Sequence, residues 1–183
     1  MENPKLYFMN ENYQKLTDLL IAKHDFSNAF IGYTELSVIN PLQYETMNVG
    51  SKFRKSFYDS DALYIDEDIF NKISLLNIKN VYSTPVSVKF TDGVSFNYIR
   101  LDSKLEIDVV DKENSIYDED GDLIKLSFDL EKIQKIKAQD LDFFKVSGLE
   151  AYQYVVSERV KNELVKHTND IEFKDEKEFE VLW

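Results

Sequence analysis

The fold prediction depends on two stretches, Leu63-Tyr-Ile-Asp-Glu-Asp-Ile-Phe-Asn-Lys-Ile-Ser-Leu-Leu76 and Tyr154-Val-Val-Ser-Glu-Arg-Val-Lys-Asn-Glu-Leu164. Each begins with a short apolar run typical of a strand and then shows apolar residues at helical spacing. Asp66 and Ser157 stand where a helix N-cap is expected. Extended segments return at Val81-Tyr82 and at Ile171–Phe173. The order strand, cap, helix, turn and strand therefore occurs twice, which predicts two related strand–helix–strand units.

Two Asp-Gly pairs in the middle of the chain predict hairpins. Asp92-Gly93 separates alternating segments at 86–90 and 94–99, and Asp120-Gly121 precedes the alternating run 123–128. Asp-Gly between alternating segments is a strong hairpin signal, because glycine adopts the positive φ that tight turns require. A short helix over 130–136 and a strand over 143–146 follow. We therefore expect an α+β fold with two strand–helix–strand units flanking a hairpin-rich antiparallel sheet.

The chain is predicted to form one domain over residues 1–183. Its 183 residues suit a single domain, and the 5 Gly and 3 Pro form no linker-like tract. Residues 1–60 are largely unassigned. A strand at Leu6–Met9 is expected, followed by Asn10 as the N-cap of a helix. The apolar residues of that predicted helix are Tyr13, Leu16, Leu20 and Ile21.

Composition excludes several classes of function. The chain has 34 acidic against 22 basic residues, a formal charge of −12. An acidic surface disfavours binding to nucleic acid and to anionic membranes. The absence of cysteine excludes disulfides, thiolate zinc sites and cysteine nucleophiles. No signal-peptide pattern and no apolar run of about 20 residues is visible, so we expect a cytoplasmic protein.

The negative charge is concentrated in one segment. Residues 102–122 contain nine acidic residues and two lysines, which is −7 of the total of −12. One interpretation is a solvated loop. The other is a docking face for a basic partner protein, since a concentrated field accelerates association. The candidate partner-binding residues are Asp108, Asp111, Glu113, Asp118, Glu119, Asp120 and Asp122.

No catalytic, metal or cofactor site is predicted. His24 and His167 fall near the C-terminal ends of predicted helices, where the helix dipole favours a protonated His without any catalytic role. Ser157 lacks the flanking glycines of a nucleophile elbow. Aligning Asp118–Asp122 with a calcium loop places Ile116 first and Ser127 last, where Asp and Glu belong. The chain is therefore not expected to be an enzyme.

Several short motifs occur in the order found in one family. They are Ile78–Tyr82 with Pro85-Val86, Ile107–Tyr117 (which contains Asp-Lys-Glu-Asn-Ser), Asp142–Val146, and Val155-Val-Ser-Glu-Arg-Val-Lys161 followed by Ile171–Phe173. With them, residues 62–173 resemble bacterial immunity proteins encoded beside polymorphic toxins, a group typified by a myxobacterial immunity domain. The chain departs from the family pattern at Thr84 and at Thr168-Asn-Asp170, where the family has an aromatic residue and a Thr-Gly pair.

The resemblance implies a non-enzymatic cytoplasmic protein that binds and neutralises a cognate toxin domain. The acidic segment 102–122 suits a basic toxin. Its motifs are expected to mark fold positions, so no binding role passes to Ser157, Glu158 or Arg159. Two alternatives stay open. One is a small-ligand-binding protein or enzyme with a pocket near His24 or near Lys52, Arg54 and Lys55. The other is an adaptor subunit unrelated to toxins.

Overall fold

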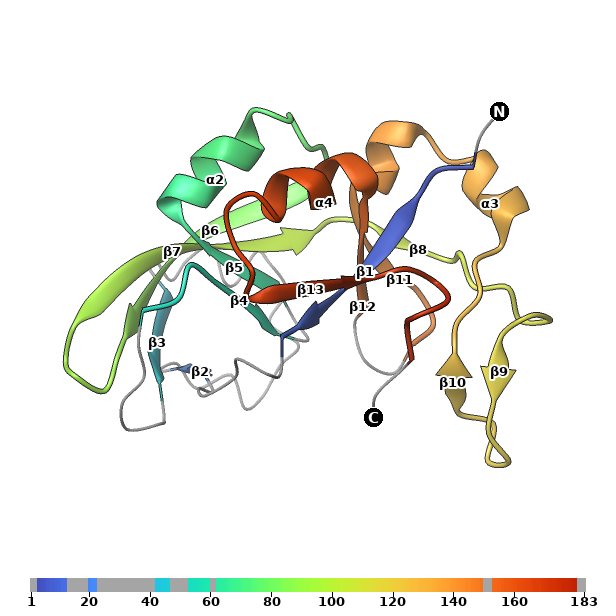
Figure 1. Ribbon diagram of the computed structural model, residues 1–183, viewed down its shortest axis with the longest axis horizontal. Helices are drawn as coiled ribbons and strands as arrows, with labels where there is room; N and C mark the ends of the chain where they lie inside the picture. The colour runs from blue at the N-terminus through green and yellow to red at the C-terminus, as the bar shows by residue number, and fades with distance from the viewer. Residues whose placement is uncertain are drawn as a thin grey trace.

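The computed structural model describes residues 3–12, 20–22, 42–46, 53–59, 62–149 and 153–180. These residues form an α+β fold, as predicted, and the fold contains two principal sheets (Figure 1). Within the described part of the chain, no helix is long and apolar enough to span a membrane.

The first sheet has six strands in the order β2-β3-β6-β7-β5-β4. Neighbouring strands are antiparallel except β3 and β6, which are parallel. Asp92 and Gly93 form the turn between β6 and β7, as predicted: Gly93 has φ +88°, and the Asp92 carboxylate accepts a hydrogen bond from the Val94 N–H at 2.9 Å. The strands are β2 (Leu20–Ala22), β3 (Leu42–Thr46), β4 (Ser56–Asp59), β5 (Ala62–Asp66), β6 (Val81–Lys89) and β7 (Ser95–Ser103).

The second sheet has five strands in the order β13-β1-β12-β11-β8. Only β11 and β8 are parallel neighbours. A separate two-stranded ladder is formed by β9 (Ile116–Tyr117) and β10 (Leu123–Lys125). The strands of the five-stranded sheet are β1 (Leu6–Glu11), β8 (Glu106–Ile107), β11 (Phe143–Val146), β12 (Gln153–Ser157) and β13 (Ile171–Lys174).

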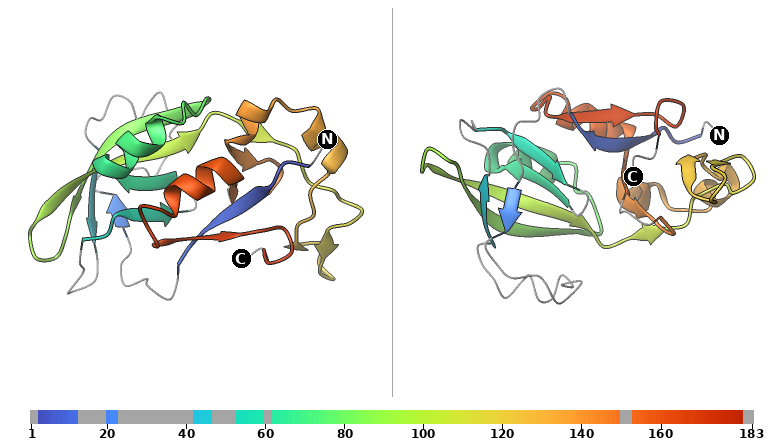
Figure 2. Two further views of the ribbon diagram at one scale, coloured as in Figure 1. Left: turned by 45° about the horizontal axis from the view of Figure 1, so that its top comes forward. Right: turned by 90° about the horizontal axis from the view of Figure 1, so that it is seen from below.

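Two helices cover the junction of the sheets and lie side by side in both sets of views, α2 (Glu67–Ser74) and α4 (Glu158–Leu164) (Figures 1 and 2). A third helix, α3 (Leu130–Gln134), and a short 3₁₀ helix, η1 (Ala138–Leu141), precede β11. Asp66 caps α2 as predicted, because its carboxylate accepts from the Ile69 N–H at 2.8 Å.

The two predicted strand–helix–strand units are present, and the structure shows how each is completed. The order β6-β7-β5-β4 in one sheet matches β13-β1-β12-β11 in the other. In both, the two strands joined through the helix are separated by a third strand antiparallel to each. That strand follows directly in the chain in the first unit, as β7, and comes from the N-terminus in the second, as β1. The β6–β7 hairpin thus belongs to the first unit and not to a separate central sheet.

The buried apolar residues form three clusters. The central cluster takes side chains from both sheets and from the two helices, including Ile69 and Ile73 of α2 and Val160 and Leu164 of α4. A second cluster lies between the five-stranded sheet and the chain around β10 and α3, with Phe8 stacked on Phe179. The third packs on the six-stranded sheet around Leu42, Tyr64 and Tyr98. The central cluster therefore joins the two sheets.

Three sequence predictions near helix starts need correction. Asn10 does not cap a helix: it lies within β1, paired with Glu172 of β13. Leu20 and Ile21 lie in strand β2 and not in a helix, while Tyr13 and Leu16 fall outside the described residues. Ser157 occupies the N-cap position of α4, but its hydroxyl binds Asp142 and caps no helix N–H. A buried carboxylate, which no local pattern reveals, competes for that hydroxyl.

Candidate functional site

The segment with the greatest negative charge forms a projection at one end of the molecule, which we call the acidic lobe (residues 108–125). It consists of the loop 108–115 and the β9–β10 hairpin, and it lies at the opposite end of the long axis from the tip of the β6–β7 hairpin (Figures 1 and 2). Val110 pairs with Phe128 in an isolated bridge, and the Asp111 N–H donates to the Ser127 carbonyl at 2.8 Å. Val110 and Leu123 are buried in the core. The lobe is thus anchored at its base.

Three of the seven predicted acids have local structural roles. The Asp111 carboxylate accepts a hydrogen bond from the Asn114 side chain at 2.7 Å and from the backbone N–H groups of Glu113 and Asn114 at 3.0 and 3.1 Å. These hydrogen bonds, above all the one from the Asn114 side chain, lower the pKa of Asp111. Asp118 accepts from the N–H groups of Asp120 and Asp122 at 3.0 and 2.8 Å. These carboxylates fix the loop and the hairpin turn.

The third, Asp108, binds Lys132 of α3 at 2.9 Å. The hydrogen bond from Lys132 lowers the pKa of Asp108, and the pKa of Lys132 is raised by the same contact. Both side chains are partly exposed, so this ion pair is accessible to solvent. It partly neutralises one acid at the base of the lobe.

The remaining four acids, Glu113, Glu119, Asp120 and Asp122, are exposed. None of them forms a salt bridge with another residue in the described part of the chain. Asp102, which also belongs to the acidic segment of the sequence, lies elsewhere: it is largely buried and binds Lys145 and Tyr154 at 2.8 and 2.7 Å. The structure therefore reduces the predicted acidic face to a smaller group of exposed carboxylates without salt bridges to described residues.

Apolar side chains are exposed among these acids. Ile116, Tyr117 and Ile124 are 53%, 40% and 40% exposed. Tyr117 and Leu123 line a pocket of about 370 Å³ between the hairpin and the turn that follows β11. Because side chains alternate along a strand, Ile116 and Ile124 point away from that pocket. This apolar component was not predicted from the sequence, although Ile116-Tyr117 and Ile124 flank the Asp-Gly turn in the positions of paired strands.

A second cluster joins two of the motifs that carry the family resemblance. Asp142, from the motif at 142–146, is 1% exposed and accepts hydrogen bonds from the Ser157 hydroxyl at 2.8 Å and from Arg159 Nε at 2.6 Å. A second guanidinium nitrogen of Arg159 also binds Asp142, and a third donates to the Leu76 carbonyl after α2 at 2.9 Å. The contact with Asp142 raises the pKa of Arg159. This cluster connects elements of the fold.

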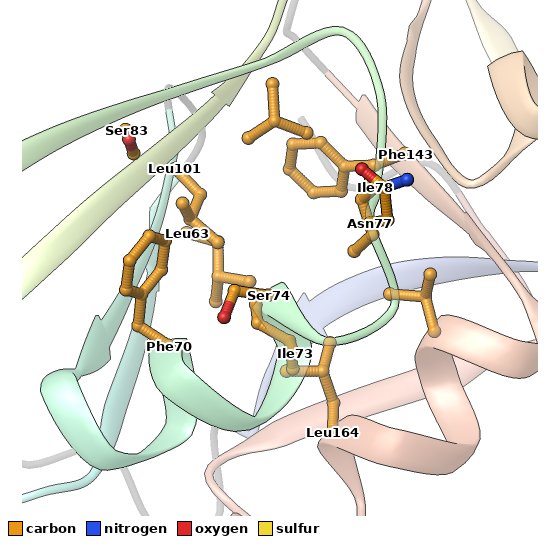
Figure 3. Close-up of a pocket in the computed structure, with 12 residues that line it drawn as sticks. Leu63, Phe70, Ile73, Ser74, Asn77, Ile78, Ser83, Leu101, Phe143 and Leu164 are labelled. Atoms are coloured by element: carbon orange, nitrogen blue, oxygen red, sulfur yellow. The ribbon is translucent and has the colours of Figure 1, made fainter.

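A third candidate is an apolar pocket of about 200 Å³ between α2 and α4 (Figure 3). Phe70 and Ile73 of α2, Leu101 of β7 and Leu164 of α4 surround it. Its polar groups are the side chains of Ser74, Asn77 and Ser83. The Lys79 ammonium group donates a hydrogen bond to the side-chain oxygen of Asn77 at 2.9 Å. The described residues that line the pocket include no carboxylate, histidine, lysine or arginine.

The other residues singled out in the sequence have structural partners or lie outside the described residues. His167 follows α4 and contacts Glu163 at 3.0 Å. Arg54, one of the basic residues near which an alternative pocket was considered, is buried and binds Glu11 at 3.2 Å. His24 and Lys52 fall outside the described residues. Where side chains are described, no group of three or more His, Asp or Glu residues is arranged to hold a metal ion.

Comparisons with known proteins add no assignment. No protein-family model matches the chain. No curated protein matches it either. The family resemblance therefore depends on the short motifs described above, and the acidic lobe is the site that the geometry and charge of this chain define best.

Proposed function

We propose that this protein is an immunity protein, without enzymatic activity, that binds and neutralises a cognate bacterial toxin through the acidic lobe. One observation carries the proposal: the acidic lobe exposes four acids without a salt bridge to any described residue, and the same lobe exposes the apolar side chains of its β9–β10 hairpin. The motif resemblance supplies the biological class, and the lobe supplies the binding surface.

The arrangement of charge suits a basic partner. Asp118 holds the turn that carries Glu119, Asp120 and Asp122, so the turn is ordered before a partner arrives. Little conformational entropy is then lost at this turn on binding. Clustered carboxylates also attract a positively charged surface over several ångströms and raise the association rate. If the toxin is a nuclease, these carboxylates would occupy the basic surface that otherwise binds phosphate.

The apolar residues supply what charge alone does not. Protein interfaces that bind tightly have an apolar centre that excludes water, surrounded by polar residues. Ile116 and Ile124, on the face of the hairpin away from the pocket, would form such a centre, and the acids of the lobe would form its rim. The acids would then raise the association rate and select a partner with a positively charged surface, while the apolar contacts would slow dissociation.

The proposal is tested by co-expression with the protein encoded by the neighbouring gene. Toxicity of that protein alone, together with restored growth and co-purification when this chain is present, is the expected result. A neighbouring gene product that inhibits growth equally with and without this chain, and that does not co-purify with it, contradicts the proposal. A catalytically inactive toxin variant allows the co-purification arm to be measured without selection against the host.

A further inference from the structure

We infer that the pocket beneath the β9–β10 hairpin binds one aromatic side chain carried on a basic segment of the partner protein. This inference rests on the proposed function and specifies the chemistry recognised at the same site. It concerns the face of the hairpin that carries Tyr117 and Leu123, opposite to Ile116 and Ile124.

The pocket is lined by both apolar and charged residues. Val110, Leu123 and Leu149 line it together with the half-exposed ring of Tyr117. Its volume of about 370 Å³ exceeds that of a single side chain, so a planar ring can enter beside Tyr117. Aromatic rings attract each other in offset or edge-to-face contact beyond the effect of buried area. The lining therefore favours an aromatic group over a polar one.

The charged residues of the pocket determine which residues can flank the bound ring in the partner's sequence. Asp108, Asp122 and the basic residue Lys112 are among the described residues that line the pocket. Asp108 is already paired with Lys132, whereas Asp122 has no salt bridge to any residue that the structure describes. Glu119 and Asp120 lie on the same turn as Asp122. Lysine or arginine residues flanking the aromatic residue would thus be attracted, and an acidic peptide would be repelled.

The test uses two blocked pentapeptides, Lys-Lys-Phe-Lys-Lys and Lys-Lys-Gly-Lys-Lys, titrated into the ¹⁵N-labelled full chain. We expect the Phe peptide to bind roughly tenfold more tightly, a difference of about 1.4 kcal/mol. Its amide shifts should centre on residues 110, 117, 123 and 147–149. Equal affinities, or shifts centred on the apolar pocket between α2 and α4, would overturn the inference.

Two variants identify the pocket. Ser147 lines it at the turn after β11, so Ser147→Trp places an indole in the space while leaving every acid in place. We expect this variant to lose the preference for Phe and to keep the weak charge-driven binding. Tyr117→Ala, which removes the exposed ring, should reduce the preference without filling the pocket. An unchanged preference in both variants, with native-like spectra, contradicts the inference.

The cognate partner separates this inference from the proposed function. If the toxin binds the wild-type chain and Ser147→Trp lowers its affinity at least tenfold, both stand. If the toxin is neutralised and its affinity for Ser147→Trp is unchanged, the pocket inference fails and the proposed function stands. If the peptides behave as expected and no toxin is neutralised, the proposed function fails and the pocket's preference stands.

Discussion

Arg159, at the start of α4, binds the buried carboxylate of Asp142, at the start of β11, through two guanidinium nitrogens. The same side chain reaches the Leu76 carbonyl beyond the end of α2 at 2.9 Å. One guanidinium therefore links both strand–helix–strand units at the junction of the two sheets. The structure thus brings Asp142 and Arg159, which lie in two separate sequence motifs, into direct contact.

Replacing Asp142 should destabilise the fold substantially. Asp142→Ala removes the acceptor for Ser157 and Arg159 and leaves the guanidinium without its partner, and we expect a loss of about 2–3 kcal/mol in the free energy of unfolding. Urea denaturation measures the change. Glu158→Gln is a matched control, because it breaks the exposed Lys5–Glu158 pair and should cost less than about 0.5 kcal/mol. Equal losses in the two variants would contradict the role given to Asp142.

Asp66 and Ser157 occupy corresponding N-cap positions, but exchanging their residue types should affect the stability of the fold very differently. Asp66→Ser keeps a side-chain oxygen for the Ile69 N–H and should change the free energy of unfolding by less than about 0.5 kcal/mol. The Ser157 hydroxyl donates to the Asp142 carboxylate at 2.8 Å, so Ser157→Asp places a second carboxylate next to that of Asp142. It should cost about 1–3 kcal/mol near neutral pH although Asp is a good cap.

Thermal or urea unfolding at several pH values checks this pair of variants. The penalty of Ser157→Asp should shrink at acidic pH, where one of the two carboxylates binds a proton. Ser157→Asn, which has a similar shape without charge, separates repulsion from size. A Ser157→Asp variant as stable as the wild type would show that the hydroxyl acts as an ordinary helix cap.

The pair formed by Asp108 and Lys132 predicts a pH effect at the base of the lobe. The hydrogen bond from Lys132 lowers the pKa of Asp108 from its ordinary 3.8. A carboxyl group with a depressed pKa in the folded state contributes stability that is fully present above the unfolded pKa. As the pH falls below the ordinary pKa of 3.8, that contribution declines, and it is lost once the pH has fallen through the lower pKa of the folded state.

Carboxyl ¹³C titration of Asp108 measures this directly. Lys132→Met should return the pKa of Asp108 toward its ordinary value, since the ammonium group is the main cause of the shift. Asp111, whose pKa is lowered mainly by Asn114, should change little in the same variant and serves as an internal control. A pKa of Asp108 that is identical in Lys132→Met and the wild type would contradict the assigned cause.

Local patterns predicted both strand–helix–strand units, because the apolar spacing of 69–73 and 160–164 and the Asp66 cap are visible without tertiary context. The Asp-Gly turns likewise predicted both hairpins. The role of residues 6–11 could not be predicted: β1 pairs with β12 and β13, and such long-range pairing leaves no local signal. The acidic segment was visible as charge. Its division into acids that shape turns, acids without salt bridges to described residues and the buried Asp102 depends on contacts across the fold.

The central claim is tested most directly by the association rate between this chain and the inactive product of the neighbouring gene, measured at about 0.02 M and about 0.5 M salt. Two triple variants remove equal charge at opposite ends of the molecule: Glu119→Gln/Asp120→Asn/Asp122→Asn in the lobe, and Glu67→Gln/Asp68→Asn/Asp92→Asn at the far end. We predict that the lobe variant associates at least about tenfold more slowly at low salt and that the difference vanishes at high salt. The far-end variant should match the wild type. Equal rates for the two variants would contradict the claim that the acidic lobe docks the toxin.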